Sequence, residues 1–451
     1  MELLQTIFYT LLALAVLVTV HEFGHFWVAR RCNIKVLRFS IGFGTPLIRW
    51  HDKQGTEFVI SALPLGGYVK MVDEREGNVS DEDLPFAFTQ KSVWQRMAVV
   101  VAGPLANFLL AIVMYWFVFF QGVTGIVPVV ESFKPDSIAE KAGLQPGHQI
   151  IAVDGESTPT WQALNEQLVG RIGESGVINF TVKVSGDPAH YEYQGQLDNW
   201  LADADQPDPI GSVGLVLYIP KILPVANEVV SGDPADKAGL IAGDMVLSAD
   251  NLSMKDWSTW VEYVRTRPGQ TIAIEVEREG RVFNTTIIPK QTVSEEGNVI
   301  GQVGMTVLVP EWPEDMILRV EYGPLDAAVR ALQQTWKTSV LILDSVKKML
   351  TGLISAKHLS GPITIAKVAG SSAQYGLTAY LGFVAFLSVS LGILNLLPVP
   401  VLDGGHLMYY LVEAVKGSPV SEKIQMVGFK IGIFLVIGLM VLALYNDVMR
   451  L

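Results

Sequence analysis

The chain has 451 residues, of which 50% are hydrophobic and 17% charged, and its formal net charge is −12. This composition excludes an ordinary soluble multidomain protein and predicts integration into a lipid bilayer. The acidic balance argues against nucleic acid as a partner, and the single cysteine, Cys32, excludes an intrachain disulfide and a cysteine-type zinc site.

Four apolar segments reach the length of about 20 residues that a transmembrane helix needs. They cover roughly residues 3–27, 98–120, 377–398 and 427–445. Basic residues gather between the first two segments and in the last interhelical loop, so the positive-inside rule places both loops in the cytoplasm. Both termini and the acidic residues 123–375 are then expected outside, which is the periplasm if the bilayer is a bacterial inner membrane.

The first apolar segment runs into the motif "HEFGH". His21 and His25 are four residues apart and share one helix face, where two imidazoles can bind one zinc ion and Glu22 can reach a water on it. Ionisable residues inside a span are typically functional, because a neutral residue would be less costly there. The alternative is a hydrogen-bonded polar cluster that ties helices together.

The cytoplasmic stretch "GTEFVISALPLGGYVKMVD" alternates β-type residues around a Pro-Leu-Gly-Gly turn, which predicts a β-hairpin rather than a helix. Its apolar content allows it to enter the bilayer, and an ordinary surface hairpin is the alternative. Gly66 and Gly67 permit close backbone approach there, or simply make a turn.

An internal repeat lies in the acidic segment. "AEKAGLQPGHQIIAVDG" at residues 139–155 matches "ADKAGLIAGDMVLSADN" at residues 235–251. A period of this length predicts two tandem homologous domains. The pattern resembles bacterial PDZ domains, which receive peptide ends or strands by sheet augmentation, and two spacer domains that bind nothing are the alternative.

After the repeat, apolar residues recur at three- and four-residue steps over residues 325–350, which predicts an amphipathic helix. Such a helix can lie on the outer membrane surface or pack against the PDZ-like pair.

The third apolar segment is interrupted at "LLPVPVLDGGH". Pro398 and Pro400 end the helix at membrane depth, and Asp403 beyond them can supply the third ligand that a catalytic zinc site needs. Asp403 can alternatively cap a helix that begins near His406. His406 is a possible fourth ligand, but four protein ligands would make a closed, structural site. Asn395 can donate a hydrogen bond to a carbonyl or oxyanion, or hold helices together.

These motifs together resemble the site-2 protease family of intramembrane zinc metalloproteases. The resemblance rests on the HExxH motif in the first span, on "GPLAN" at residues 103–107, on the paired PDZ-like insertion and on the motif from Asn395 to Gly405, and it covers essentially the whole chain. It implies Zn²⁺ held by His21, His25 and Asp403, with Glu22 as general base.

The resemblance also implies which residues meet the substrate. Asn395 would lie close to it, and "PLGGYVKM" would belong to a membrane-reentrant hairpin. The unwound transmembrane segment of the substrate would add to that hairpin as a strand. The substrate-binding residues are accordingly expected to be Asn395, Gly66, Gly67, Tyr68 and Val69.

The predicted fold is a polytopic α-helical membrane protein with four transmembrane helices, a cytoplasmic-side membrane-reentrant β-hairpin and two tandem periplasmic PDZ-like (α+β) domains. The expected layout is helix 1 at 1–30, a cytoplasmic loop at 31–97, helix 2 at 98–121, PDZ-like domains at 122–220 and 221–310, a helical region at 311–375, helix 3 at 376–406 and helix 4 at 427–446.

The predicted function is intramembrane zinc-dependent cleavage of single-span membrane proteins, of the anti-sigma factor type and including remnant signal peptides. The PDZ-like domains would screen these substrates, and the active site would lie towards the cytoplasmic side of an inner-membrane protein. A catalytically inactive membrane PDZ scaffold and a zinc transporter are the alternative functions.

Overall fold

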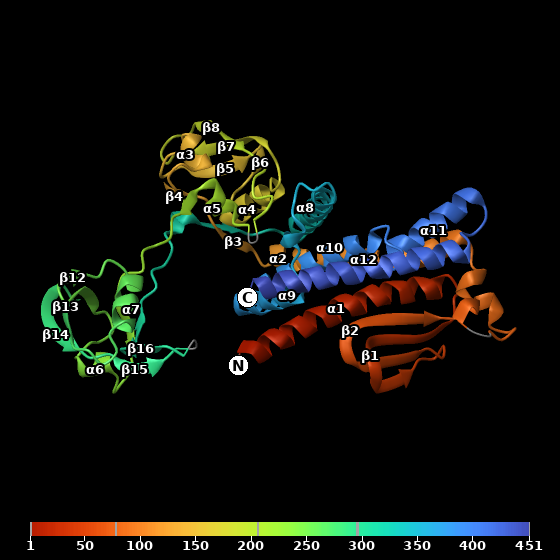
Figure 1. Cartoon of the computed structure of the whole chain (residues 1–451), viewed down its shortest axis with the longest axis horizontal. Helices are drawn as coiled ribbons and strands as arrows, with labels where there is room; N and C mark the ends of the chain where they lie inside the picture. The colour runs from red at the N-terminus through yellow and green to blue at the C-terminus, as the bar shows by residue number, and fades with distance from the viewer. Residues whose placement is uncertain (1, 77–78, 205–206, 295–296, 451) are drawn as a thin grey trace. The chain divides into compact units, whose positions relative to one another are not determined.

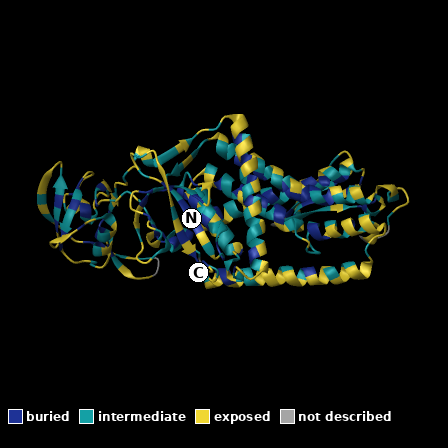
Figure 2. Ribbon diagram, turned by 90° about the horizontal axis from the view of Figure 1, so that it is seen from above, coloured by how far each residue is buried: buried dark blue, intermediate teal, exposed yellow. Residues whose placement is uncertain are grey.

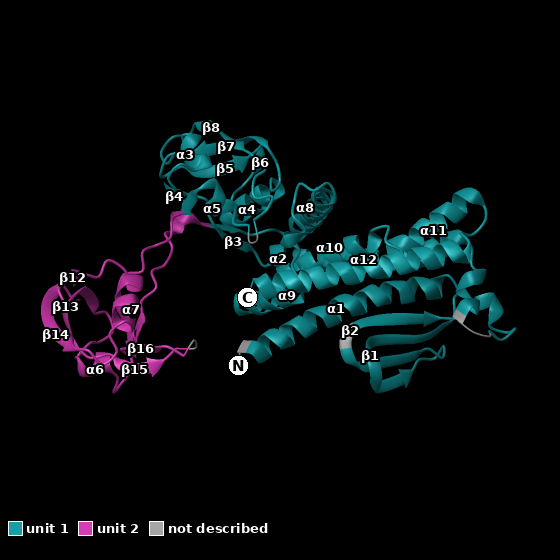
Figure 3. Cartoon of the chain, viewed as in Figure 1, with its two compact units in different colours: residues 1–216, 318–451 teal, residues 217–317 magenta. Residues whose placement is uncertain are grey.

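The structure, a computed structural model, describes residues 2–76, 79–204, 207–294 and 297–450 (Figure 1). It divides into two compact units, residues 1–216 with 318–451 and residues 217–317 (Figure 3). Among the described residues, four helices are long and apolar enough to cross a membrane. They are α1 (Glu2–Arg31), α2 (Val93–Phe120), α10 (Leu377–Leu396) and α12 (Glu422–Met449).

Three of these helices, α1, α2 and α12, extend beyond the apolar segments that define them in the sequence. α2 begins five residues before the predicted span, because Ser92 and Gln95 form a capping box that satisfies its first backbone N–H groups. α10 ends at Leu396, earlier than predicted, because Pro398 and Pro400 cannot continue it. α1 and α12 remain largely exposed, as lipid-facing helices would be, and Figure 2 shows this for α12, the long helix that ends beside the C label.

Between α1 and α2 lie two long strands, β1 (Val36–His51) and β2 (Glu57–Met71), which pair antiparallel beside α1 (Figure 1). The sequence predicts that the two halves of β2, residues 57–60 and 67–71, pair with each other as a hairpin. This prediction is wrong, because each half pairs with β1 instead. The register instead places residues 36–41 between residues 57–60 and residues 67–71. Residues 67–71 therefore form an edge strand. Three short 3₁₀ turns follow: η1 (Glu74–Glu76), η2 (Leu84–Phe86) and η3 (Phe88–Gln90).

The first unit also contains a small α+β domain, here named the first repeat domain. Its main sheet has the order β6-β5-β7-β8. Its elements are β3 (Val123–Ile126), β4 (Val130–Phe133), α3 (Ile138–Lys141), β5 (Gln149–Val153), β6 (Glu156–Ser157), α4 (Trp161–Gly170), β7 (Gly176–Lys183), β8 (His190–Leu197), α5 (Pro209–Val213) and β9 (Leu215–Leu217).

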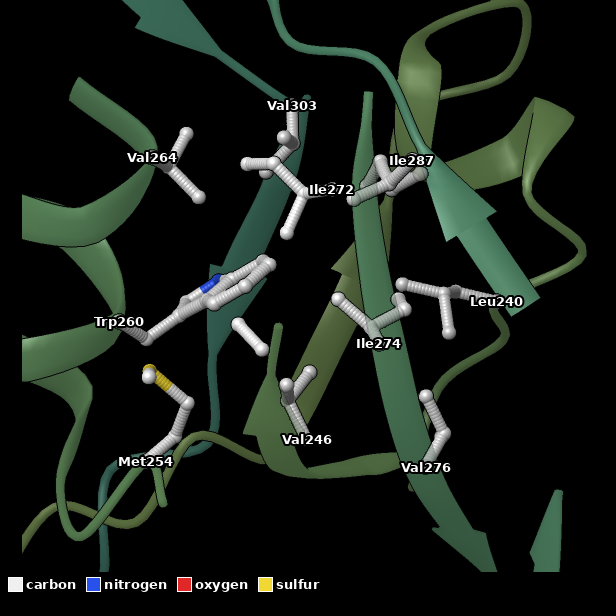
Figure 4. Packing of buried hydrophobic residues seen from close by; sticks show 12 residues of the cluster. Leu240, Val246, Met254, Trp260, Val264, Ile272, Ile274, Val276, Ile287 and Val303 are labelled. Carbon is white, nitrogen blue, oxygen red and sulfur yellow. The ribbon is translucent and has the colours of Figure 1, made fainter. Parts of the chain in front are cut away.

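The second unit, here named the second repeat domain, has a sheet of equivalent order, β12-β11-β13-β14. Its core gathers around Trp260, which is fully buried among aliphatic side chains of the sheet (Figure 4). Its elements are β10 (Ala226–Val229), α6 (Pro234–Lys237), β11 (Met245–Ala249), β12 (Leu252–Ser253), α7 (Trp257–Arg265), β13 (Ile272–Arg278), β14 (Arg281–Ile287), β15 (Lys290–Val293), β16 (Val299–Gln302), β17 (Met305–Val307) and η4 (Glu314–Met316).

The internal repeat of the sequence is thus repeated in the backbone. Gly143 and Gly239 occupy matching positions and have φ of 87° and 79°. Asp154 and Asp250 also match, with φ of 51° and 47°. Because few residues other than glycine, aspartate and asparagine adopt this left-handed conformation, the shared residues are those that the shared turns require.

The chain re-enters the first unit through β18 (Ile317–Val320), which pairs with β3, and the predicted amphipathic helix then spans α8 (Pro324–Leu350). Small residues of α8 such as Ala327 and Ala331 are buried, whereas Leu325, Val329, Leu332, Trp336, Val340 and Leu343 are exposed. Lys348 of α8 forms an ion pair of 2.6 Å with Glu174 in the first repeat domain. Packing of α8 against the first repeat domain is therefore observed, and the apolar stripe of α8 stays exposed.

The remaining segments of the first unit lie before and after α10 in the chain. They are η5 (Ala356–His358), α9 (Pro362–Gln374) and α11 (Asp403–Lys416). α9 contacts α1, and α11 contacts α2. The Asp447 carboxylate near the end of α12 accepts hydrogen bonds from three backbone N–H groups at the start of α9. That interaction caps α9, whose own N-cap residue, Gly361, has no side chain to do so.

Candidate metal centre

Two imidazoles meet on one face of α1. His21 and His25 are one helical turn apart, and their Nε2 atoms lie 3.2 Å from each other. The i, i+4 spacing places both rings on the same face, as the sequence predicts. His21 is buried and His25 half-buried, so neither ring is freely hydrated.

The break between α10 and α11 brings a carboxylate to the same point. Asp403 Oδ2 lies 3.3 Å from His21 Nε2 and 3.6 Å from His25 Nε2. Among the described residues this oxygen is buried without a hydrogen-bond partner. Asp403 is the first residue of α11, and the cap position belongs to Leu402. The alternative interpretation of Asp403 as a helix cap is therefore wrong.

These three atoms fit a zinc ion. Tetrahedral zinc with bonds of about 2.0–2.1 Å separates its ligand atoms by about 3.3 Å. The observed separations of 3.2, 3.3 and 3.6 Å agree with that value. The orphaned oxygen of Asp403 is explained if a cation is its partner, since a buried carboxylate oxygen is costly without one. His21, His25 and Asp403 can therefore hold zinc and leave one position open.

The other nitrogen of each imidazole contacts α2. His25 Nδ1 lies 2.8 Å from the backbone oxygen of Val99, so its N–H can donate there and leave Nε2 for a metal. His21 Nδ1 lies 3.1 Å from the side-chain nitrogen of Asn107. Both rings are therefore oriented by α2.

Glycines allow α1 and α2 to approach this closely. A Cβ added at Gly24 would overlap the Ala102 backbone oxygen. A Cβ added at Gly103 would lie 2.5 Å from His25 Cε1 and 2.9 Å from His21 Cε1. Both distances are well below ordinary contact, so α2 can carry no side chain where the two imidazoles pack.

A cavity of about 300 Å³ opens beside the three ligand atoms. Glu22, His25 and Asp403 line it together with Val69 of the β2 edge strand and Tyr410 of α11. Glu22 follows His21 directly in the chain and lines this cavity. The atoms His21 Nε2, His25 Nε2 and Asp403 Oδ2 are here named the ligand triangle. A water or a peptide group in this cavity would lie close to both the ligand triangle and Glu22.

The edge strand approaches Glu22 directly. A Cβ added at Gly67 would lie 2.9 Å from Glu22 Cγ and 2.8 Å from the Ser40 backbone oxygen. Gly66 has φ of 156° and packs against the Phe43 ring, at the bend that separates the two halves of β2. Tyr68 stacks on Phe43 and accepts a hydrogen bond from Arg38.

Two further residues singled out in the sequence lie outside the ligand triangle. His406 lines the cavity one turn after Asp403, but the group of close ligand atoms among the described residues contains only His21, His25 and Asp403. Asn395 lies half-buried in the last turn of α10, without a hydrogen bond to these three side chains among the described residues. Gly103 and Asn107 stand in the "GPLAN" motif, but their contacts with the histidines depend on a helix crossing that sequence analysis does not predict.

Known proteins resemble the chain over its full length. A family model described as peptidase family M50 matches residues 9–439. The "Regulator of sigma-E protease RseP" of Escherichia coli (strain K12) is 46% identical over 441 residues, which cover 98% of each chain. "Protease RseP" of Yersinia pestis is 44% identical over 451 residues and all of both chains. A Vibrio cholerae protein named "Putative zinc metalloprotease" is 41% identical over 98% of both.

Proposed function

Because the chain belongs to peptidase family M50, we propose that it is an intramembrane zinc endopeptidase that cuts the transmembrane segments of single-span membrane proteins. The observation that carries the proposal is the triangle of His21, His25 and Asp403 ligand atoms beside Glu22, in a helix of membrane-spanning length. Three protein ligands leave one position for water or substrate, which is typical of a catalytic rather than a structural zinc site.

Each residue has a role that follows from its place. When bound, zinc supplies Lewis acidity to a water molecule and to the substrate carbonyl. Glu22 takes the proton of the attacking water and then delivers it to the leaving amide nitrogen, so it acts as base and acid in turn. Asp403 brings a negative charge that favours the cation, and α2 holds the two imidazoles in place.

The substrate must be extended before it can be cut, because a helix hides its carbonyls in its own hydrogen bonds. Residues 67–71 support a role in holding it, since they form an edge strand whose far side has no partner strand among the described residues. An extended peptide added there would lie beside Gly67, which contacts Glu22, and Val69, which lines the cavity. Tyr68 and Gly66 would shape the same edge, and Asn395 would meet the substrate from α10.

Crosslinking tests this assignment. Photoreactive residues placed along residues 67–71 should capture a bound single-span substrate, whereas the same probe along residues 46–51, at the opposite edge of the sheet, should not. Equal capture at both edges would contradict the assignment.

The membrane orientation follows from charge. Arg30 and Arg31 end α1 on the side to which the β1–β2 sheet and its basic residues belong. We place this side in the cytoplasm of a bacterial inner membrane, with both termini and both repeat domains in the periplasm. The ligand triangle lies close to this end of α1, so water reaches it from the cytoplasm by a short path. The β1–β2 sheet would then be the membrane-reentrant element, and the exposed stripe of α8 would rest on the outer lipid surface.

The two repeat domains would act as tandem PDZ-like domains that screen substrates. In the second repeat domain, a cavity of about 700 Å³ lies between α7 and residues 292–305. Trp257, Trp260 and Arg265 line it, which supports the binding of a peptide end or strand there. The names of the relatives refer to sigma-E regulation, so we propose an anti-sigma factor already trimmed outside the membrane as one substrate and remnant signal peptides as others.

Reconstitution tests the activity. Full-length protein in liposomes should cut a co-reconstituted single-span substrate within its transmembrane segment, and a zinc chelator should stop cleavage until zinc is restored. An inactive scaffold would bind the substrate without cutting it, and a zinc transporter would move the metal across the bilayer. Cleavage that persists after the metal has been removed would contradict the proposal.

A further inference from the structure

A buried asparagine of α2 faces the first metal-binding histidine. Asn107 is completely buried, and its side-chain nitrogen lies 3.1 Å from His21 Nδ1. Its side-chain oxygen Oδ1 is also buried and has no hydrogen-bond partner among the described residues. An unpaired buried amide oxygen is uncommon and destabilising, so its orientation needs an explanation.

The metal site itself supplies that explanation. A neutral imidazole carries one N–H, so if His21 Nε2 offers its lone pair to a metal, His21 Nδ1 must carry the hydrogen. An amide NH₂ group directed at that N–H would bring two donors together. The nitrogen and oxygen of an asparagine amide have nearly the same shape and exchange places by a half-turn of the side chain. That half-turn sacrifices no hydrogen bond of Oδ1, because Oδ1 has none.

We propose that Asn107 is a positioning residue whose side-chain oxygen accepts the Nδ1 hydrogen of His21 and thereby keeps His21 Nε2 available to the metal. His25 is held in the equivalent way, because its Nδ1 lies 2.8 Å from the Val99 backbone oxygen. His25 is thus oriented by the main-chain oxygen of Val99, and His21 by the side chain of Asn107, eight residues further along the same helix. The inference rests on the proposed zinc site.

The position of Asn107 is itself fixed by α10. The Ser388 hydroxyl donates a hydrogen bond of 2.7 Å to the backbone oxygen of Asn107. Ser388 is fully buried and lies on the helix that leads to the chain break before Asp403. The turn of α2 that carries Asn107 is therefore attached to α1 through His21 and, through Ser388, to α10, the helix that precedes the Asp403 break.

Metal binding by purified full-length protein tests the role, with Co²⁺ as a spectroscopic probe of the coordination geometry. Asn107→Leu removes the acceptor at similar volume, and it should weaken Co²⁺ and Zn²⁺ binding about 10–100-fold and change the visible Co²⁺ spectrum. Asn107→Asp keeps an acceptor and removes the donor, and it should restore both the spectrum and binding close to that of the wild type. If Asn107→Leu does not fold, Asn107→Ala takes its place and should show the same weaker metal binding and changed Co²⁺ spectrum.

A matched control separates positioning from general stability. Asn446 is another buried asparagine, at the end of α12, where it donates to the backbone oxygens of Ala356 and Leu359. Asn446→Leu should lower the thermal stability but leave the Co²⁺ affinity and spectrum unchanged. Wild-type affinity and spectrum in Asn107→Leu, or loss of metal in Asn107→Asp equal to that in Asn107→Leu, would overturn the inference. Failure of the wild type to bind either metal would instead contradict the zinc site on which the inference rests.

Discussion

Replacing Gly103 by alanine places one methyl group against His21 and His25, the proposed metal ligands. The new Cβ would lie 2.5 Å from His25 Cε1 and 2.9 Å from His21 Cε1. Carbon atoms in ordinary contact lie about 3.5–4.0 Å apart. Because Gly103 is inside α2 and its backbone cannot yield easily, the His25 ring must retreat by about 1 Å to remove the overlap.

A displacement of this size is incompatible with the ligand triangle. Metal–ligand distances tolerate deviations of only about 0.2 Å, so His25 should leave the coordination sphere in Gly103→Ala. A misplacement of about 1 Å costs on the order of 100-fold in catalysis, and we expect a loss of that order in cleavage together with a fall in zinc affinity. The helix itself should not suffer, because alanine favours helical structure more than glycine does.

The assay compares two glycine-to-alanine variants of membrane helices. Zinc per protein is measured by metal analysis after dialysis against a weak chelator, and cleavage is measured in liposomes. Gly382→Ala in α10 is the control, because a Cβ there meets no heavy atom within 4 Å. Gly103→Ala should lose zinc and activity while Gly382→Ala keeps both. Full zinc content and wild-type cleavage in Gly103→Ala would show that a methyl group at this position does not displace His25.

Three further predictions concern separate parts of the molecule. Asp403→Asn should reduce the zinc content of purified protein, because it removes the charged ligand; an undiminished content would indicate His406 or another ligand instead. Deletion of residues 126–310 should allow untrimmed substrates to be cut, and unchanged discrimination would contradict substrate screening by the repeat domains. Burial lowers the pKa of His148 below its ordinary value of 6.5, so the unfolded chain takes up the proton first as the pH falls. The opening free energy of the first repeat domain, measured by hydrogen exchange in the full chain, should therefore be highest above about pH 6.5 and decrease at lower pH. This decrease should be smaller in His148→Gln. Equal pH dependence in both proteins would show that another group is responsible.

The sequence predicts the grouping of His21, His25 and Asp403 because the signals for it are local. The spacing of His21 and His25 fixes a shared helix face, and the prolines before Asp403 fix a break in the chain at membrane depth. The repeat predicts two similar domains for an equally local reason. Glycine or aspartate recurs wherever the two backbones need a left-handed turn, as at Gly143 and Gly239.

The contacts between elements could not be predicted in this way. A lipid-exposed helix is apolar on nearly every face, so its pattern does not indicate which residues of α2 meet α1. The contacts of Gly103 and Asn107 with the histidines depend on that crossing. The β1–β2 sheet is a second case, because residues 36–41 separate the two halves of β2, whereas the turn pattern of the sequence suggested that those halves pair with each other.

In the proposed mechanism, Glu22 performs proton transfer at a zinc ion held by other residues. Zinc content and cleavage of a reconstituted single-span substrate, measured on the same preparations of the wild type and Glu22→Gln, test it most directly. The variant should keep zinc at the wild-type level, because Glu22 lies outside the ligand triangle, and should leave the substrate uncut. A Glu22→Gln protein that still cuts the substrate would show that Glu22 is not the proton-transfer group.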